Sequence, residues 1–312
     1  MITFPSAPQH VLVTGGTGFI GQALIKELLA NQHQVTVLSR NVQKAQALFK
    51  GKVQAISHLA DFKPNTPITA VINLAGARIL GKPWTAKQKA VLRASRIQLT
   101  QTLIDWMAQQ TTKPPVLLSA SAIGYYGIQR QGDQTALTET SPPQAIFMSE
   151  LCQDWEKTAL QAQSYGVKVA TMRFGVVLGQ GGALPMMLLP VKLGVGGRMG
   201  TGQQWMSWIH LEDLLQALAH AWSELVNNPN AAKAYNFTAP EVVTQEQFVK
   251  TAAGVLKRPS FFPTPAWPVK LLLGEQADLL LEGQKVIPQA LTQKGFKFKY
   301  PTMRSALEAI CG

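Results

Sequence analysis

The stretch HVLVTGGTGFIGQALIKELL, residues 10–29, constrains the fold more than any other part of the chain. A short apolar run ending at Val13 leads into Gly15, Gly18 and Gly21, and a helical pattern follows. The first glycine permits a tight turn, the second lets a diphosphate approach the backbone, and the third lets the helix pack closely on the strand. The helix N-terminus offers free N–H groups to phosphates. This pattern predicts a dinucleotide-binding strand, turn and helix; a plain glycine-rich turn is the alternative.

The first 178 residues continue this alternation of short apolar runs and longer helical patterns. Runs such as QVTVLS, AVINLAG, VLLSAS and KVATMRFG are nearly continuous in apolar residues, and helical patterns cover residues 19–30, 86–109 and 149–164; a further helical pattern follows later in the chain, at 211–226. Strands of this kind that alternate with helices indicate a parallel sheet covered on both faces. We therefore expect the α/β fold class, with a Rossmann-type doubly wound parallel sheet over residues 1–178.

The composition changes after Gly179. Residues 179–204 are rich in glycine, proline and methionine, and residues 259–268 contain four prolines. Because such segments interrupt regular structure, we expect a smaller C-terminal substrate lobe made of residues 179–205 and 241–312. Its helices are expected around residues 244–257, 269–282 and 301–310. The segment 206–240 is expected to return to the first domain.

The charge of the chain favours anionic partners. Of 312 residues, 46% are hydrophobic and 15% are charged, which excludes disorder, and the net charge is +12. The Lys and Arg residues occur in ones and twos, so no nucleic-acid partner is expected. No stretch approaches roughly 18 uninterrupted apolar residues, and the start lacks the features of a signal peptide. We expect a cytoplasmic protein, no membrane partner and a small-molecule substrate.

The cysteine content argues against metal and disulfide chemistry. Cys152 and Cys311 are the two cysteines of the chain. Two are too few for a disulfide framework or a structural zinc site, so no metal is expected and both are interpreted as helix-packing residues.

The end of the second apolar run bears on the choice of cofactor. Proteins that bind NAD usually have an acid about 20 residues past the glycines, where it holds the ribose hydroxyls. Here the run ends in Ser39, Arg40 and Asn41, and Lys44 follows a turn later. A cation at this place suits a 2′-phosphate. We predict NADP(H) in preference to NAD(H), which stays possible; a solvated Arg40 without this role is the alternative.

With these residues in place, the chain resembles the extended, sugar-nucleotide-epimerase branch of the short-chain dehydrogenase/reductase superfamily. The motifs that carry the resemblance, besides the glycines, are NLAG at 73–76, SASAIGYYG at 119–127, MRFGVVLG at 172–179 and WIHLEDL at 208–214. A closer resemblance is to the YfcH-like epimerase-family proteins, through NLAGARILGKPWTAKQKAVLRASRIQLT, LCQDWE and GTGQQWMSWIHLEDL. The block at about 262–310 resembles their C-terminal domain, DUF1731. Ala77 departs from the subgroup, which usually has Glu after NLAG.

The glycine pattern and this resemblance together predict the residues that bind the cofactor. They come from the glycine turn, the ends of the second and fourth strands, and the sixth strand: Gly15, Thr17, Gly18, Phe19, Ile20, Gly21, Ser39, Arg40, Asn73, Leu74, Ala75, Gly76 and Arg173.

The catalytic pair that the resemblance implies is absent. The superfamily uses a Tyr with a Lys four residues later, where the Lys cation lowers the pKa of the tyrosine. The five tyrosines of this chain are followed at that distance by Gln129, Arg130, Val169, Ala239 and Arg304. Phe147 and Leu151 stand at the aligned place, in an apolar stripe with Trp155. Because loss of a positioned acid removes roughly 10² to 10⁴ in rate, the usual mechanism must be weak, rebuilt or absent.

Three other residues are candidates for a rebuilt catalytic site. The resemblance places Ser121 where the superfamily hydrogen-bonds the substrate oxygen, and Tyr125 and Tyr126 follow in a loop near the carboxyl ends of the strands. The alternative is that all three pack a turn around Gly124 and Gly127.

A second group is expected to face the substrate. Arg96 occupies the place where the branch usually has an Asn, and its cation suits a phosphate or carboxylate; a surface position is the alternative. His210 resembles a residue that mostly supports the substrate lobe, with a catalytic role as the alternative. The other members of the group are Arg198, Gln204 and Trp205.

Two functions remain open from the sequence. The first is an NADP(H)-dependent oxidoreductase or epimerase of unknown substrate, anionic or nucleotide-linked, with a non-standard active site. The second is a dinucleotide-binding regulatory protein without turnover, linked to cell division. By analogy, superfamily members are often homodimers through the helix at 149–164.

Overall fold

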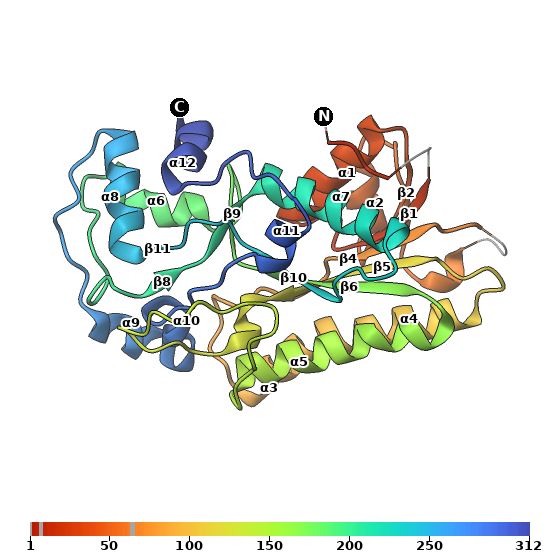
Figure 1. Ribbon diagram of the computed structural model, residues 1–312, viewed down its shortest axis with the longest axis horizontal. Coiled ribbons are helices and arrows are strands. Elements are labelled where there is room, and N and C mark those ends of the chain that lie inside the picture. Colours follow the sequence, from red (N-terminus) through yellow and green to blue (C-terminus); the bar gives the residue numbers. More distant parts are fainter. Residues whose placement is uncertain (1, 6–8, 63–65) are drawn as a thin grey trace.

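The computed structural model describes residues 2–5, 9–62 and 66–312 and has the expected α/β architecture (Figure 1). Seven strands form one sheet in the order β10-β6-β5-β4-β1-β2-β3, and each neighbouring pair is parallel. The strands are β1 (His10–Thr14), β2 (Gln34–Leu38), β3 (Gln54–Ile56), β4 (Ala70–Asn73), β5 (Val116–Ala122), β6 (Lys168–Phe174) and β10 (Ala234–Phe237). The strand order reverses between β1 and β4, where open α/β sheets bind ligands at the carboxyl ends of the strands.

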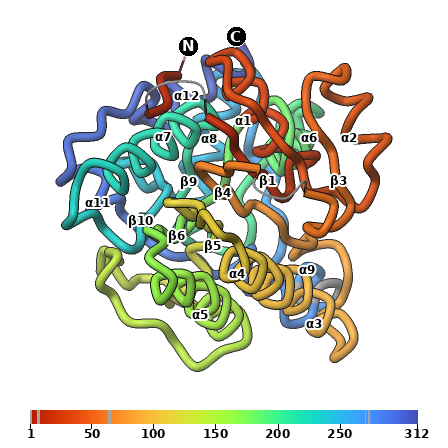
Figure 2. Tube along the Cα trace, turned by 90° about the vertical axis from the view of Figure 1, so that its right-hand side faces the viewer, coloured from red at the N-terminus to blue at the C-terminus, as the bar shows by residue number. Residues whose placement is uncertain are grey.

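Helices cover both faces of the sheet, which explains the apolar runs. Val11, Leu12 and Val13 of β1 are all fully buried, because neighbouring side chains point to opposite faces and each face has its own core. One face is covered by α1 (Phe19–Ala30) and α7 (Leu211–Asn227), the other by α4 (Leu99–Gln109) and α5 (Phe147–Leu160), as Figure 2 shows. Helix α2 (Val42–Leu48) follows β2.

The long helix expected over residues 86–109 contains one irregular turn. Helix α3 (Ala86–Arg93) begins at Thr85, whose side chain accepts a hydrogen bond from the Gln88 N–H, and runs through the π-helical turn η2 (Ala94–Gln98) into α4. A π-helical turn inserts an extra residue and therefore rotates the side chains that follow; such turns are frequent at functional sites. Here the turn carries Arg96.

The helix α5 begins at Phe147, two residues before the expected start, and the 3-10 turn η4 (Gln161–Tyr165) continues it. Differences of this size are ordinary for helix ends.

A second core lies beyond the carboxyl ends of the strands. Helices α6 (Leu184–Lys192), α8 (Gln245–Leu256) and α12 (Met303–Cys311) enclose Trp208 and Phe248 there. The small strand pairs are β7 (Val176–Leu178) with β9 (Trp208–His210), and β8 (Trp205–Met206) with β11 (Val243–Thr244). The remaining short elements are η1 (Leu59–Asp61), η3 (Ile123–Tyr126), α9 (Ala266–Leu273), η5 (Gly274–Ala277), α10 (Asp278–Leu281) and α11 (Gln289–Gln293). The helix expected over 269–282 is thus divided into three pieces.

Within the described ranges, no helix has both the length and the apolar character needed to cross a bilayer. The same ranges contain no group of three or more His, Cys, Asp or Glu side chains able to hold a metal ion.

Candidate functional site

The glycine turn between β1 and α1 has the close contacts that only glycine allows. Gly15 has φ +68°, and a Cβ atom there would lie 2.6 Å from the carbonyl carbon of Leu74, the residue that follows β4. A Cβ atom at Gly21 would collide with the Gly15 backbone oxygen. Gly18 begins α1 without a side-chain cap, so the N–H groups of the first turn stay available to a ligand. The turn therefore suits the diphosphate of a dinucleotide.

Two residues predicted to bind the cofactor use their side chains inside the protein instead. Asn73 is buried; its Oδ1 accepts from the Thr14 hydroxyl at 2.7 Å, and its Nδ2 donates to Thr100 at 2.9 Å and to Ser119 at 3.2 Å. Its side chain joins β1, β4, α4 and β5 behind the turn. The chain continues after β4 with Leu74, Ala75 and Gly76, and the first of these contacts the glycine turn at Gly15.

Phe19 is the second such residue. Cβ atoms at Gly179, Gly181 and Gly182 would each lie 2.7 to 2.9 Å from its ring, so a glycine-rich loop encloses the aromatic side chain. The ring therefore links the glycine turn to the second core, and the backbone of Phe19 remains for phosphate. Ile20 next to it packs against the core below the turn, and the Thr17 carbonyl accepts from Gln22.

The end of β2 presents cations without a carboxylate. Arg40 and Lys44 are exposed, and neither forms an ion pair with any residue that the structure describes. The Ser39 hydroxyl donates to the Asn41 carbonyl at 3.1 Å, and the Asn41 side chain accepts from the Lys44 N–H at 2.8 Å to cap α2. The arrangement leaves both cations free for an anionic group.

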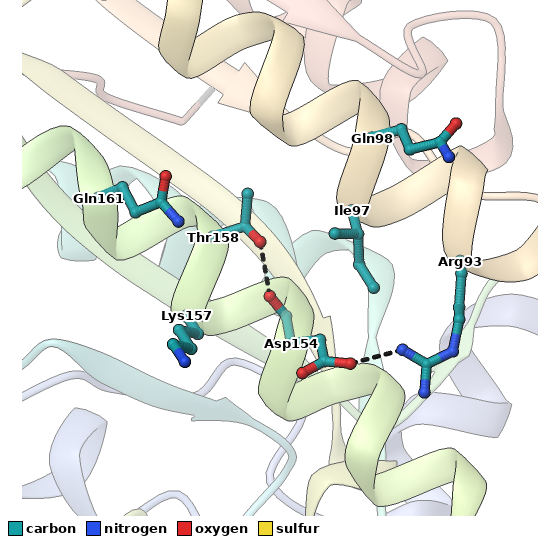
Figure 3. Close-up of a pocket in the computed structure, with 7 residues that line it drawn as sticks. All are labelled: Arg93, Ile97, Gln98, Asp154, Lys157, Thr158 and Gln161. Carbon is teal, nitrogen blue, oxygen red and sulfur yellow. Dashed lines mark hydrogen bonds and ion pairs between the residues drawn. The ribbon is translucent and has the colours of Figure 1, made fainter.

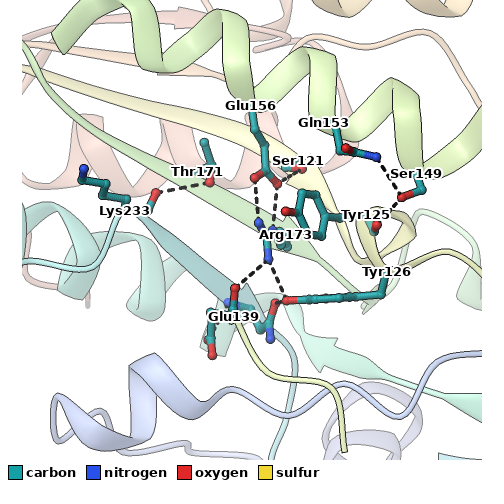
Figure 4. A network of polar contacts seen from close by, with 11 residues as sticks. Ser121, Tyr125, Tyr126, Glu139, Ser149, Gln153, Glu156, Thr171, Arg173 and Lys233 are labelled. Atoms are coloured by element: carbon teal, nitrogen blue, oxygen red, sulfur yellow. Dashed lines mark hydrogen bonds and ion pairs between the residues drawn. The ribbon is translucent and has the colours of Figure 1, made fainter. Parts of the chain in front are cut away.

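A buried polar network closes the ends of β5 and β6 (Figure 4). Nε and Nη2 of Arg173 donate to the two carboxylate oxygens of Glu156, each at 2.8 Å, and the Ser121 hydroxyl donates to Glu156 Oε1 at 2.6 Å. Nη1 of Arg173 donates to the Tyr126 hydroxyl at 2.9 Å, which in turn donates to Asn236 at 2.6 Å. All five side chains are buried.

This network changes the interpretation of three predicted residues. Burial alone lowers the pKa of Arg173, but its bonds to Glu156 outweigh that effect and raise it, so the guanidinium is an internal cation paired with Glu156. Burial raises the pKa of Tyr126 to about 12, which makes its proton hard to remove. Ser121 and Tyr126 are 2% exposed, and their hydroxyls donate to Glu156 and Asn236, so both side chains take part in the packing of the interior.

Tyr125 differs from its neighbour. It is half-buried, its ring lies 3.4 Å from the Arg173 guanidinium carbon, and it meets the Tyr126 ring edge-on. Its hydroxyl makes no hydrogen bond with the part of the chain that the structure describes. Of the three catalytic candidates, Tyr125 is therefore the one whose hydroxyl has no hydrogen-bond partner within the described ranges.

The side of α5 that packs against the turn after β5 carries Met148 and Cys152, and Phe147 points elsewhere. The Phe147 ring packs edge-on against Trp84 at 5.2 Å, toward α3. A Cβ atom at Gly124 would instead lie 2.8 Å from Met148 Cγ and 3.7 Å from Cys152 Sγ. One residue turns a helix by about 100°, so Phe147 and Met148 point in different directions, and Met148 and Cys152 are the α5 residues beside the turn at Gly124. Burial raises the pKa of the Cys152 thiol to about 12.

The π-helical turn η2 directs the Arg96 side chain toward Gly76 and Ala77, which follow β4. Its Nη2 donates to the Ala77 carbonyl at 3.0 Å, and a Cβ atom at Gly76 would lie 3.1 Å from its guanidinium carbon. The guanidinium also stacks over the Trp155 ring, 5.3 Å from its centroid. Burial lowers the pKa of Arg96, and no carboxylate within the described ranges forms an ion pair with it. A half-buried cation that has no carboxylate partner can pair with an anionic group of a ligand.

Three other predicted substrate-facing residues, Gln204, Trp205 and His210, use their side chains in hydrogen bonds within the protein. The Gln204 side chain donates to the Met199 and Leu280 carbonyls, and Trp205 Nε1 donates to the Asp133 carbonyl. His210 caps α7 by accepting from the Glu212 N–H at 3.1 Å, and burial lowers its pKa to about 4. These contacts indicate structural roles. Arg198 is exposed.

A groove of about 430 Å³ lies elsewhere, between the π-helical turn and the outer side of α5 (Figure 3). In it, Arg93 pairs with Asp154 at 2.5 Å. The residues of α5 that line this groove lie on the opposite side of the helix from Met148 and Cys152. Helix α5 therefore separates the groove from the turn at Gly124. Its lining residues are Arg93, Ile97, Gln98, Asp154, Lys157, Thr158 and Gln161.

The sequence did not predict that Glu156, Asn236 and Trp155 form buried hydrogen bonds. One signal was present for Glu156: it follows Cys152 by one helical turn, so a carboxylate lies on an otherwise apolar face and needs a buried partner.

Comparisons with known proteins match almost the whole chain. Residues 11–237 match the NAD dependent epimerase/dehydratase family, and residues 264–310 match a domain of unknown function, DUF1731. The epimerase family protein SSP1921 of Staphylococcus saprophyticus is 41% identical over 306 residues, covering 96% of this chain and 98% of that protein.

Among solved structures, the human epimerase family protein SDR39U1 (isoform 2) with NADPH has a TM-score of 0.85 and 34% identity, covering 96% of this chain and 98% of that one. MoeE5 in complex with UDP-glucose and NAD has a TM-score of 0.72 at 20% identity, covering 96% of this chain and 97% of that one, which shows a shared fold.

Proposed function

The chain belongs to the NAD dependent epimerase/dehydratase family and ends in a DUF1731 domain, and from this premise we propose that it is an NADP(H)-dependent oxidoreductase or epimerase acting on an anionic small molecule. The observation that carries the proposal is the glycine turn joined to a basic, acid-free end of β2. Relatives named as epimerase-family proteins do not favour the alternative, a regulatory protein without turnover.

A preference for NADP(H) is supported by Arg40 and Lys44. Both are exposed beside the place where a 2′-phosphate would lie, and a carboxylate that would hold the ribose of NAD is missing from the end of the strand. A related structure contains NADPH, and a more distant one contains NAD.

The dissociation constants of NADPH and NADH, measured by calorimetry, test this preference. A charge-assisted hydrogen bond contributes about 1.5–3 kcal/mol, so Arg40→Ala should weaken NADPH binding by about tenfold or more and leave NADH binding unchanged. Lys52→Ala, at another exposed cation, is the matched control. Equal affinities for the two nucleotides in the native protein would overturn the preference.

For the chemical step we propose that Tyr125 and Arg96 replace the missing Tyr-x-x-x-Lys pair. The glycine turn and Arg40 would hold NADPH, whose chemistry when bound would be the transfer of a hydride to a carbonyl carbon of the substrate. As the electron pair of the carbonyl bond moves onto its oxygen, the Tyr125 hydroxyl gives that oxygen a proton. Arg96 holds a carboxylate or phosphate of the same molecule beside Gly76. Tyr125 has the uncommitted hydroxyl, and Arg96 is the cation without an acid.

Oxidation of NADPH by a panel of keto acids and nucleotide sugars, followed at 340 nm, tests this assignment. Tyr125→Phe should lower kcat by roughly 10² to 10⁴ with little change in stability. Tyr126→Phe, the neighbouring control, should lower stability and leave kcat closer to that of the native protein. Full turnover in Tyr125→Phe would reject the assignment.

A further inference from the structure

The second lobe carries most of the exposed apolar surface that the structure describes. Thirteen large hydrophobic side chains are exposed within the described ranges, and eight of them lie in two segments of this lobe. Met186, Trp267 and Leu271 are 80%, 69% and 77% exposed. We call the eight residues the apolar patch: Met186, Leu189, Leu193, Val195, Phe261, Phe262, Trp267 and Leu271. A concentration of this kind marks an interaction surface.

The two segments of the apolar patch lie side by side. The Phe262 N–H donates to the Gly196 carbonyl at 3.1 Å, and the Thr264 N–H donates to the Arg198 carbonyl at 2.8 Å. Figure 1 shows the connection from α8 to α9 running next to the one from α6 to β8. The rings of Phe261 and Phe262 lie 4.6 Å apart. The patch is therefore one surface formed by both segments.

Helix α6 is apolar on both sides. Leu184, Leu188 and Val191 are buried in the second core, whereas Met186 and Leu189 are more than half exposed. A helix that is hydrophobic all round is normally enclosed on all sides. The outer side of α6 lacks such a cover.

The charged residues around the apolar patch indicate what kind of surface covers it. Residues 180–211 and 247–274, which contain the patch, include no Asp or Glu and six basic residues: Lys192, Arg198, Lys250, Lys257, Arg258 and Lys270. Lys192, Lys257 and Arg258 are exposed. Glu246, just before the second segment, pairs with Lys250 at 2.9 Å, whereas Lys192, Lys257 and Arg258 form no ion pair within the described ranges. Exposed aromatic and aliphatic side chains beside such unpaired cations match an anionic bilayer surface, where the apolar groups enter the headgroup region and the cations contact lipid phosphates.

We propose that the apolar patch binds the surface of a membrane that contains anionic lipids. The sequence predicts no membrane partner because no stretch is long enough to span a bilayer, but binding in the plane of the surface needs no spanning helix. The proposal does not depend on the catalytic assignment.

Co-sedimentation of the full chain with vesicles tests the proposal. Binding is expected to vesicles of phosphatidylcholine with about one third phosphatidylglycerol, and far less to phosphatidylcholine alone. Phe261→Ser with Trp267→Ser should lower the partition coefficient at least about tenfold, because two large apolar side chains no longer enter the bilayer. Lys257→Glu with Arg258→Glu should lower it by a similar factor and weaken its dependence on salt.

Leu48→Ser with Val91→Ser is the matched control, since both residues are exposed hydrophobics outside the patch. This control should bind vesicles as the native chain does, and every variant should keep its increase in melting temperature with NADPH, which shows that it is folded. No binding of the native chain to anionic vesicles would overturn the proposal, and so would an equal loss in the control. A native dimer that Phe261→Ser with Trp267→Ser dissociates, without vesicle binding, would assign the patch to a second copy instead.

Discussion

Replacing Glu156 with Gln tests whether the buried ion pair holds the ends of β5, α5 and β6 together. Two nitrogens of Arg173 donate to the Glu156 carboxylate at 2.8 Å, and the two side chains are only 4% and 8% exposed. Gln keeps the shape but removes the charge, so the guanidinium stays buried without a counter-ion. Removing one partner of a buried pair costs about 3–5 kcal/mol of the free energy of unfolding. The Ser121 hydroxyl loses its charged acceptor as well.

Urea unfolding followed by tryptophan fluorescence measures this loss as a lower midpoint at an unchanged slope. Glu150→Gln is the matched control: it lies on the same helix, 3.9 Å from Arg93, with both side chains at least 40% exposed. It should cost less than about 1 kcal/mol. Combining Glu156→Gln with Arg173→Met should recover part of the loss, because the uncompensated charge is gone. If Glu156→Gln costs no more than Glu150→Gln, or the double variant is no more stable than the single one, this account of the pair is wrong.

Further predictions concern the cofactor turn, pH and the buried tyrosine. Gly21→Ala should destabilise the protein by about 1–3 kcal/mol and weaken NADPH binding, because the new Cβ atom collides with the Gly15 oxygen. Gly254→Ala, at an open position of α8, should instead stabilise the protein by about 0.5–1 kcal/mol. Urea midpoints measure both changes in stability, and calorimetry measures NADPH binding. Burial lowers the pKa of His210 below its unfolded value, so its contribution to stability is present above pH 6.5 and is lost as the pH falls toward 4. His210→Asn keeps the cap and should flatten the urea midpoint between pH 6.5 and 4; an unchanged pH dependence would contradict this. Tyr126→Phe should cost about 1–3 kcal/mol, since Asn236 and Arg173 each lose a buried partner; a change below about 0.5 kcal/mol would contradict it.

Local patterns in the sequence were sufficient for the fold. The helix expected over 19–30 has those bounds, and the apolar runs became the central parallel strands. The resemblance to the epimerase family and to DUF1731 is confirmed by matches over 11–237 and 264–310. These features depend on short-range periodicity and on glycine positions, which act within a few residues of the chain.

The local sequence pattern predicted the candidate site only in part. The helical pattern from 147 onward identified an apolar stripe, but it did not identify which residues of that stripe face the end of β5. The answer, Met148 and Cys152 rather than Phe147, depends on how α5 packs against Gly124. A rotation of about 100° for each residue makes such an assignment sensitive to an error of a single position.

The sequence by itself determined the fold class, the dinucleotide-binding turn and the absence of a Tyr-x-x-x-Lys pair. The tertiary structure decided which candidates keep a group available to a ligand. Tyr126 and Asn236 are 110 positions apart, and Ser121 and Glu156 are 35 apart. Burial and hydrogen bonding between such distant segments are set by the packing of whole elements, so two adjacent tyrosines that look alike in the sequence differ in the folded chain. The Tyr126 hydroxyl is buried and hydrogen-bonded to Asn236 and Arg173, whereas the Tyr125 hydroxyl has no hydrogen-bond partner among the described residues.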